Sequence, residues 1–166
     1  MATKTASSSP GTKSAKVKPI PTGYHAITPY LIIDGAARAI EFYRRAFDAK
    51  EMLRIPAPND RIGHAEIKVG DSVIMLADEH PEMDARAPGH FGGSPVSLLL
   101  YVTDVDKQFK QALEAGATEV RPVADQFYGD RSGTLKDPFG HSWHLSTHKE
   151  DVSMDEMARR MAAMKQ

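Results

Sequence analysis

Cysteine is absent from all 166 residues, which excludes disulfide bonds, thiolate metal ligands and a cysteine nucleophile. The sequence also has no apolar run near the roughly 20 residues that cross a bilayer, and its first residues contain no apolar core of a secretion signal. An excess of one charge is missing too, since 21 basic residues stand against 22 acidic ones. Such a balance argues against nucleic acid or an anionic membrane as a partner. We therefore expect a cytoplasmic protein that uses His, carboxylate or water for any metal site.

The first 22 residues have almost nothing to bury, being rich in Ser, Thr, Lys and Pro. Ordering such a segment would cost conformational entropy without a hydrophobic return, so residues 1–22 are predicted to be a disordered tail. Four lysines and no acidic residue make the tail basic. We favour a solubilising extension over a nucleic-acid-binding arm.

A strand, a helix and three strands are predicted for the first half of the chain, about residues 24–78. β-forming residues fill the stretch Tyr24 to Ile33, although Pro29 argues for an edge or a bulge there. Asp34 is then expected to cap an amphipathic helix over residues 36–47. Strands should follow at 49–55, 61–69 and 72–78, the last two joined by a turn at Gly70.

The same order of elements is predicted again for residues 95–147, after a linker or lid rich in Gly and Pro at 79–94. A strand at 95–102 leads to a helix capped by Asp104 and ended by Gly116, followed by strands at 118–124, 132–136 and 141–147. Ile32-Ile33-Asp34 recurs as Val102-Thr103-Asp104 and Gly70 recurs as Gly140, both 70 residues later. This recurrence indicates a duplicated unit.

The last segment, residues 149–166, is predicted to be a helical extension. Ser153 to Glu156 form a capping box that opens a helix to about Met164. Its methionines lie along one side, at positions 154, 157, 161 and 164. Such a stripe needs a cover, and we favour docking on this domain or on a partner subunit over an arm that grips a ligand.

Five short motifs in this order resemble the vicinal oxygen chelate superfamily, which includes glyoxalases, bleomycin resistance proteins and dioxygenases, and most closely its PhnB-like branch. The resemblance spans about residues 24–148. The motifs are Pro29-Tyr30-Leu31, Ala39-Ile40-Glu41-Phe42-Tyr43, His64-Ala65, Gly129-Asp130-Arg131 and Asp137-Pro138-Phe139-Gly140-His141-Ser142-Trp143.

This resemblance implies an α+β domain over residues 23–148, in which two βαβββ modules form curved mixed sheets around a cleft for a small organic molecule. It also implies a homodimer, because subunits of this superfamily often share modules. The helix near the C-terminus would be an addition to this fold.

Catalytic members of the superfamily hold a divalent metal ion with His or Glu from the first and last strands of each module. The resemblance places the first-strand positions at Ile27 and Ser97, and the last-strand positions at His144 and Ile74. Only His144 is a usual ligand, so the standard site looks degenerate and a Zn, Mn, Fe or Ni ion is not favoured.

A rearranged metal or acid/base site is the alternative. His64 and Glu66 share one face of a predicted strand, and together with His144 they are the candidate catalytic and metal-binding residues. A plain polar pair at His64 and Glu66 is equally compatible with the alternation. A solvated or ligand-contacting His144 is favoured over a metal-bound one.

The candidate ligand cleft adds a loop around Gly129 to the strand positions. Tyr128 offers an aromatic wall there, and Arg131 offers a guanidinium to an anionic ligand, unless it forms a local ion pair. The full set of cleft candidates is Ile27, Ser97, Tyr128, Arg131 and His144.

Three functions remain open at this point. The first is a small-molecule-binding protein with a degenerate metal site. The alternative is a metal-dependent lyase, isomerase or dioxygenase acting on a substrate with adjacent oxygens, or a metal-free enzyme that uses the same His and Glu residues. A third is a structural or regulatory protein that docks through its methionine-rich helix.

Overall fold

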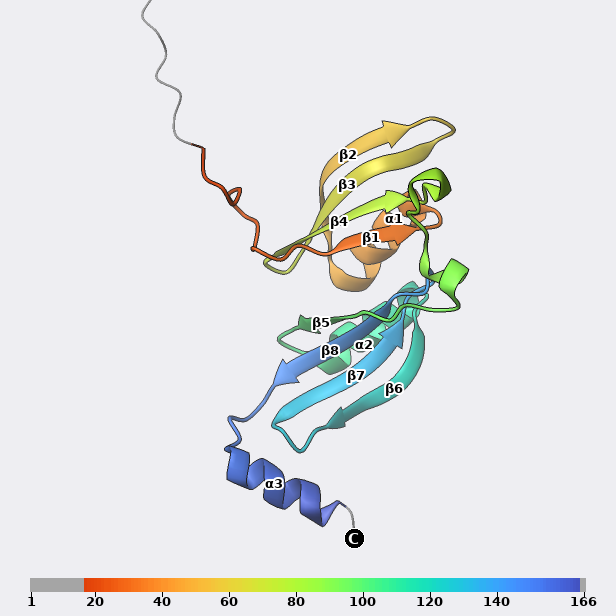
Figure 1. Ribbon diagram of the computed structural model, residues 1–166. Coiled ribbons are helices and arrows are strands. Elements are labelled where there is room, and N and C mark those ends of the chain that lie inside the picture. Colours follow the sequence, from red (N-terminus) through yellow and green to blue (C-terminus); the bar gives the residue numbers. More distant parts are fainter. Residues whose placement is uncertain (1–16, 165–166) are drawn as a thin grey trace, which may run out of the picture.

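The computed structural model describes residues 17–164. The disordered tail predicted for residues 1–22 therefore lies outside the described residues, except for residues 17–22, which are exposed. The strands form two four-stranded sheets, which lie one above the other in Figure 1. The elements in chain order are β1 (Tyr30–Ile33), α1 (Ala36–Phe47), β2 (Lys50–Ala57), β3 (Arg61–Val69), β4 (Ser72–Asp78), the 3-10 helices η1 (Pro81–Met83) and η2 (Pro88–Phe91), β5 (Ser97–Tyr101), α2 (Val105–Ala115), β6 (Thr118–Asp125), β7 (Asp130–Lys136), β8 (Ser142–His148) and α3 (Met154–Ala163).

The two sheets have the same topology, with strand orders β1-β4-β3-β2 and β5-β8-β7-β6. In each sheet the first strand runs parallel to the last, and the other neighbours are antiparallel. The predicted α+β fold of two βαβββ modules with a C-terminal helix is confirmed. The first strand is shorter than predicted, because it begins only after Pro29, which has no N–H to donate to a neighbouring strand.

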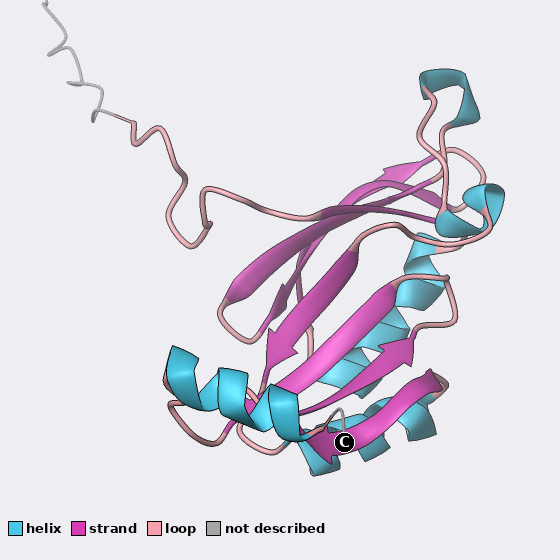
Figure 2. Cartoon of the chain, turned by 60° about the horizontal axis from the view of Figure 1, so that its bottom comes forward, coloured by secondary structure: helices cyan, strands magenta, loops and turns pink. Residues whose placement is uncertain are grey.

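Each sheet buries one face, and the two buried faces belong to one hydrophobic core. Helix α1 supplies the aromatic centre of this core: the rings of Tyr43 and Phe47 lie 5.5 and 4.6 Å from that of Trp143 on β8. Helices α1 and α2 also pack against each other (Figure 2), and Gln108 Nε2 donates to Ala46 O at 2.6 Å. We call the face of each sheet that neither α1 nor α2 covers its open face.

The two helices begin differently, which corrects one prediction. Asp104 caps α2 as predicted, accepting from Lys107 N at 3.0 Å. Asp34 does not cap α1: the cap residue is Gly35, with φ of 91°, and its side-chain partner comes from β4. There Asp78 Oδ1 accepts from Gly35 N at 3.0 Å and from Ala36 N at 2.8 Å. The carboxylate from the end of the module replaces the local cap that the sequence suggested.

The structural repeat has an offset of 69 residues rather than the 70 inferred from sequence. The helices begin at Ala36 and Val105, which are 69 residues apart. The core-facing Leu76 and Leu145, at 0% exposed, are also 69 residues apart, and so are their partners Leu31 and Leu100. The Gly70 and Gly140 turns mislead because β3 and β4 are joined by two residues, whereas 137–141 join β7 and β8.

The segment between the modules is folded rather than extended. His80 and Ala85 form an isolated antiparallel bridge, and Ala87 N donates to Glu79 Oε1 at 2.6 Å. Ala87 and Pro88 are buried. This linker therefore forms a fixed wall beside β1 and β5.

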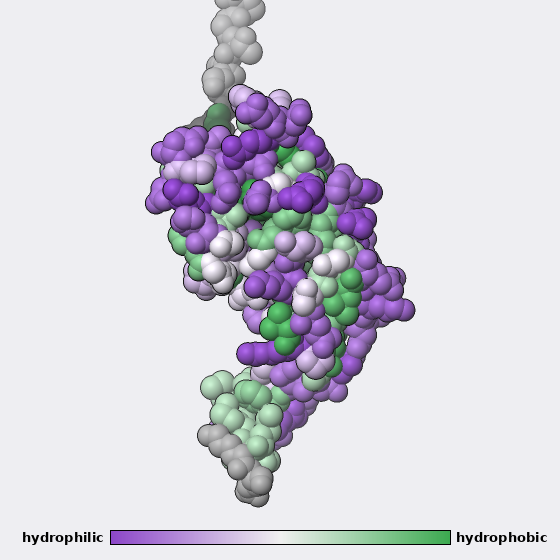
Figure 3. All heavy atoms as spheres, turned by 90° about the vertical axis from the view of Figure 1, so that its right-hand side faces the viewer, coloured by the Kyte–Doolittle hydropathy of each residue, from purple (hydrophilic) through white to green (hydrophobic). Residues whose placement is uncertain are grey.

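Helix α3 projects from the body of the domain. Ser153 caps it as predicted, accepting from Glu156 N at 3.3 Å. None of its residues is buried, and Met154 and Met161 are 78% and 44% exposed. Figure 3 shows hydrophobic side chains gathered on this projecting end. Met157 is half-buried, but the domain leaves the other three methionines of the stripe exposed. Within residues 17–164, no helix is long and apolar enough to span a membrane.

Candidate functional site

A chain of hydrogen bonds crosses the open face of the first sheet. Tyr30 Oη lies 3.0 Å from His64 Nδ1, and His64 Nε2 lies 3.3 Å from Glu66 Oε1. Tyr24 Oη donates to the other oxygen of Glu66. The alternation of β3 thus brings His64 and Glu66 together as predicted, and two tyrosines from the N-terminal side complete a row of four polar side chains.

The environment of Glu66 favours its charged form. The hydrogen bond from Tyr24 lowers the pKa of Glu66, against the opposing effect of burial, and the same contact raises the pKa of Tyr24. Glu66 is only 9% exposed, so an anion and its donors sit within a mostly buried position. A carboxylate held by a tyrosine and an imidazole is able to accept a proton or a hydrogen bond from a ligand.

Apolar side chains frame this row. On the neighbouring strand β2, Leu53 pairs with Glu66 and Ile55 pairs with His64. Leu53 and Ile55 are 42% and 49% exposed, although large apolar residues usually lie inside. A few fixed polar groups among apolar surroundings are typical of surfaces that bind small organic molecules.

The open face of the second sheet holds His144. Its Nδ1 lies 3.0 Å from Thr134 Oγ1, and the residue pairs with Leu99 on β5. Ser97 is exposed at the start of β5, and Ile27 is 87% exposed before β1. By the offset of 69, the counterpart of His144 is Met75, which corrects the earlier assignment to Ile74; Ile74 is buried in the core.

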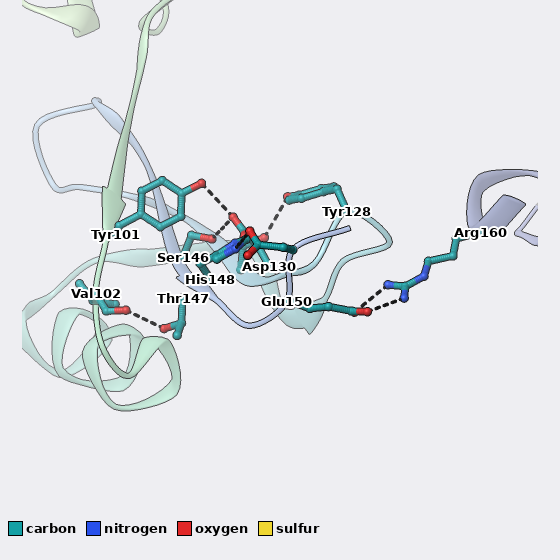
Figure 4. Close-up of polar contacts among 11 residues, drawn as sticks. Tyr101, Val102, Tyr128, Asp130, Ser146, Thr147, His148, Glu150 and Arg160 are labelled. Atoms are coloured by element: carbon teal, nitrogen blue, oxygen red, sulfur yellow. Dashed lines mark hydrogen bonds and ion pairs between the residues drawn. The ribbon is translucent and has the colours of Figure 1, made fainter. Parts of the chain in front are cut away.

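Asp130 forms a further polar cluster on this sheet, shown in Figure 4. The carboxylate is 6% exposed and accepts from Tyr101 Oη at 3.0 Å and Ser146 Oγ at 2.8 Å through Oδ2. His148 Nδ1 lies 2.7 Å from Oδ1. Although burial acts in the opposite direction, these hydrogen bonds hold the pKa of Asp130 below its usual value, and the carboxylate raises the pKa of His148.

Sequence reasoning missed this cluster, although it noted the Gly129-Asp130-Arg131 motif. The alternation of Ser142, His144, Ser146 and His148 along β8 could have indicated it, because it predicts a polar face of the strand whose side chains need hydrogen-bond partners. Tyr101 carried no such signal.

The two remaining cleft candidates lie apart. Tyr128 is 38% exposed, and its hydroxyl lies 3.4 Å from Ser132 Oγ, next to the Asp130 cluster. Arg131 points to the helix side of β7, where it donates to Asp106 at 2.7 Å and to Asp125 at 3.2 Å. Both carboxylates raise the pKa of Arg131 further. Its guanidinium is engaged in local ion pairs and is directed away from His144.

The residues at the superfamily's metal positions do not fit a divalent ion. Ile27 and Met75 offer no suitable ligand atom, and Ser97 offers only a neutral hydroxyl, so His144 is the one imidazole at the four positions. Among residues 17–164, no group of three or more His, Asp or Glu side chains is placed to hold a metal ion.

Comparison with known proteins gives one family and several relatives. The family model described as Glyoxalase/Bleomycin resistance protein/Dioxygenase superfamily matches residues 24–145. An uncharacterized protein of Mycobacterium bovis is 44% identical over 141 residues, covering 83% of this chain and 93% of that protein. An uncharacterized protein of Arabidopsis thaliana is 26% identical over 125 residues, covering 71% of this chain and 74% of that protein.

Solved structures share the fold. The crystal structure of TioX from Micromonospora sp. ML1 has 29% sequence identity and a TM-score of 0.61, covering 74% of this chain and 97% of that chain. The structure titled putative 3-demethylubiquinone-9 3-methyltransferase, PhnB protein, from Bacillus cereus has 20% identity and a TM-score of 0.57, covering 74% and 99%. The second likeness is one of fold alone.

Proposed function

The chain belongs to the glyoxalase/bleomycin resistance protein/dioxygenase superfamily, and from this premise we propose that it binds a small organic molecule on the open faces of its sheets without a catalytic metal ion. The observation that carries the proposal is the hydrogen-bonded row on the first sheet. Tyr30, His64, Glu66 and Tyr24 stand in contact on a face that the domain's own helices leave uncovered.

The row offers both donors and acceptors to a ligand. Glu66 in its charged form accepts hydrogen bonds, the tyrosine hydroxyls donate or accept, and His64 does either according to its tautomer. Leu53 and Ile55 supply apolar contact next to them. We expect a ligand with a hydroxyl or amine group attached to an apolar body, because an amine or hydroxyl would donate to Glu66.

Binding is favoured over metal chemistry by the side chains at the inherited ligand positions. Ile27 and Met75 have lost ligating ability, and Ser97 offers only a neutral hydroxyl. A Lewis acid in this family needs several strong ligands from both modules, and His144 alone does not supply them. Sequence motifs such as Pro29-Tyr30-Leu31 support placement in the PhnB-like branch, which remains part of this proposal.

The test is a fragment screen by two-dimensional NMR on metal-stripped protein, using small amines, alcohols and phenols with apolar bodies. Hits should shift the resonances of His64, Glu66 and Ile55, and Glu66→Gln should weaken them by about tenfold or more, since hydrogen bonds to charged groups contribute about 1.5–3 kcal/mol. The matched control is Glu114→Gln, which changes an exposed carboxylate on α2. The proposal would be refuted if the hits shifted no resonances of the first sheet, or if their affinity fell equally in both variants.

The second candidate is an enzyme, and the contact of His64 with Glu66 at 3.3 Å is the observation that favours it. A histidine beside a carboxylate is a common acid/base pair. Elemental analysis after titration with Zn²⁺, Mn²⁺, Fe²⁺ and Ni²⁺ tests the metal-dependent form of this candidate. One metal ion per chain that is lost in His144→Ala or His64→Ala would replace the binding proposal with the enzyme.

We also propose that the protein is a homodimer. Strand β2 is the outer strand of the first sheet, and its residues are exposed from Lys50 to Pro56, including the apolar Met52 and Leu53. A second copy is the simplest cover for such an edge, which otherwise invites aggregation. Sedimentation equilibrium should give twice the chain mass, and a monomer at all concentrations would contradict this.

A cytoplasmic location stays a prediction from the sequence.

A further inference from the structure

A cavity lies between the two modules, beside the linker. It has a volume of about 310 Å³ and is bounded by β1, the segment around η2 and the start of β5. Its walls are mostly apolar, formed by Leu31, Pro88, Phe91, Val96 and Leu98. None of the residues of the hydrogen-bonded row except Tyr30 borders it. The cavity therefore adjoins the surface to which the proposed function refers at Tyr30 and shares no other residue of the row with it.

His141 brings an unsatisfied polar group to this cavity. The residue is only 6% exposed and lines the wall, yet neither ring nitrogen has a hydrogen-bond partner among the described residues. Nδ1 is fully buried and lies 3.6 Å from Asp137 Oδ2, too far for a hydrogen bond. Nε2 remains the accessible nitrogen. An acceptor on a ligand in the cavity would give Nε2 a hydrogen-bond partner, whereas Nδ1 stays buried beside Asp137.

Asp137 does not supply the missing partner because it is already saturated. Its Oδ1 accepts from Phe139 N and His141 N, both at 2.9 Å, and its Oδ2 accepts from Tyr43 Oη at 2.7 Å and Trp143 Nε1 at 3.0 Å. The carboxylate is thus fixed in the core behind the imidazole ring.

Arg86 adds a cation at the cavity. Its side chain is 30% exposed, and its ion pair is a loose one at 3.5 Å to Asp84, a carboxylate that is 94% exposed. Pairs of this kind contribute little. No other described carboxylate lies within ion-pair distance of Arg86, so its guanidinium is free to bind an anion from the cavity.

We propose that this cavity is a binding site for a small organic carboxylate with an apolar body. The apolar walls would enclose the body, and Arg86 and His141 would bind the carboxylate by charge-assisted hydrogen bonds. A volume of about 310 Å³ lies at the lower end of ligand sites, which fits one ring or a short branched chain. The same volume favours acids of this size over larger ones.

Benzoate is the probe, with benzamide as its neutral isostere, and binding is followed by NMR titration and calorimetry of the full chain. Benzoate should saturate at one molecule per chain and shift the resonances of Leu31, Leu98 and His141, whereas benzamide should bind at least tenfold more weakly. Arg86→Met keeps the apolar stem and removes the charge, and it should weaken benzoate by about tenfold or more. Val96→Trp, at a position that is 66% exposed, should abolish binding by filling the cavity.

Arg38→Met is the matched control. Arg38 and Arg86 both line a neighbouring groove between α1 and the turn at Pro138, but Arg38 does not border the cavity. Arg38→Met should leave benzoate affinity unchanged. Equal affinity for benzamide, equal losses in the two arginine variants, or the absence of saturable benzoate binding would overturn the proposal. So would resonance shifts confined to His64 and Glu66, which would assign the ligand to the open face instead.

Discussion

Replacing Tyr43 by Phe tests how the two modules are held together. Tyr43 belongs to α1 in the first module, and its hydroxyl donates to Asp137 Oδ2, in the turn of the second module, at 2.7 Å. Both residues are buried, at 0% and 4% exposed. The substitution removes one oxygen atom and leaves the ring in place, so the loss reports the hydrogen bond between the modules.

The expected loss is about 2 kcal/mol of unfolding free energy, since a hydrogen bond to a charged group contributes about 1.5–3 kcal/mol. Asp137 keeps its other three donors, which limits the damage. A loss of this size raises the unfolding equilibrium constant roughly 30-fold and lowers Tm by about 5 °C for a chain of this length. Asp137→Ala should cost more, because it also leaves the buried Trp143 Nε1 without an acceptor.

Urea denaturation followed by Trp143 fluorescence measures the loss, with Tyr30→Phe as control. Tyr30 is 48% exposed and also shares one hydrogen bond, with His64. Tyr30→Phe should therefore lose less than about 0.5 kcal/mol of unfolding free energy. Equal losses in the two variants, or no loss in Tyr43→Phe, would refute the reasoning.

Acid pH gives a second measurement of the same contact. The pKa of Asp137 is lowered in the folded protein: burial, the largest influence, would raise it, but the nearby His141 and then the hydrogen bonds from Tyr43 and Trp143 outweigh that effect. The stability it contributes is therefore present above the ordinary value of 3.8 and is lost as pH falls through the folded value. The stability difference between wild type and Tyr43→Phe should shrink over that acid range.

Three further outcomes follow from particular contacts. In Gly129→Ala, the added Cβ would lie 2.1 Å from Glu150 O at a residue with φ of 99°, so limited proteolysis should cut the segment before α3 faster while the core stays intact. His148 has a raised pKa because of Asp130. The segment before α3 should therefore be fully protected from hydrogen exchange below pH 6.5, as long as Asp130 stays charged. This protection should fall as the pH rises through the pKa of His148 in the folded protein. Gly133→Ala would place a methyl group 2.6 Å from a ring on α2 and should cost about 1–3 kcal/mol in urea denaturation.

Local sequence patterns predicted the helices and strands well where contacts between residues close in the sequence determine the structure. The strands Arg61–Val69 and Ser72–Asp78 match the predicted bounds, because alternation and a two-residue turn are properties of adjacent residues. Asp104 and Gly116 likewise mark the ends of α2 as predicted. The start of α1 was misassigned because the carboxylate that binds it, Asp78, is 42 residues away from Ala36 in the sequence.

The candidate site divides in the same way. The shared face of His64 and Glu66 follows from the two-residue period of a strand, and the structure places their side chains in contact. Tyr24 meets Glu66 from 42 residues away, and Tyr101 meets Asp130 from 29 residues away, so neither contact has a signature in one sequence. The sequence also could not show that Arg131 turns toward α2, because an arginine in a strand suits either face.

The start of each helix donates a hydrogen bond to the last strand of its own module, and for α1 this strand supplies the side-chain cap. Asp78 at the end of β4 binds the first N–H groups of α1, and Thr147 on β8 binds Val105 N of α2 at 2.9 Å. During synthesis on the ribosome, α1 therefore lacks its N-terminal partner until residue 78 has left the exit tunnel, long after the helix itself has emerged. Each half of the chain should consequently become stable late and all at once, and a nascent chain cut short before Asp78 should remain open to proteases.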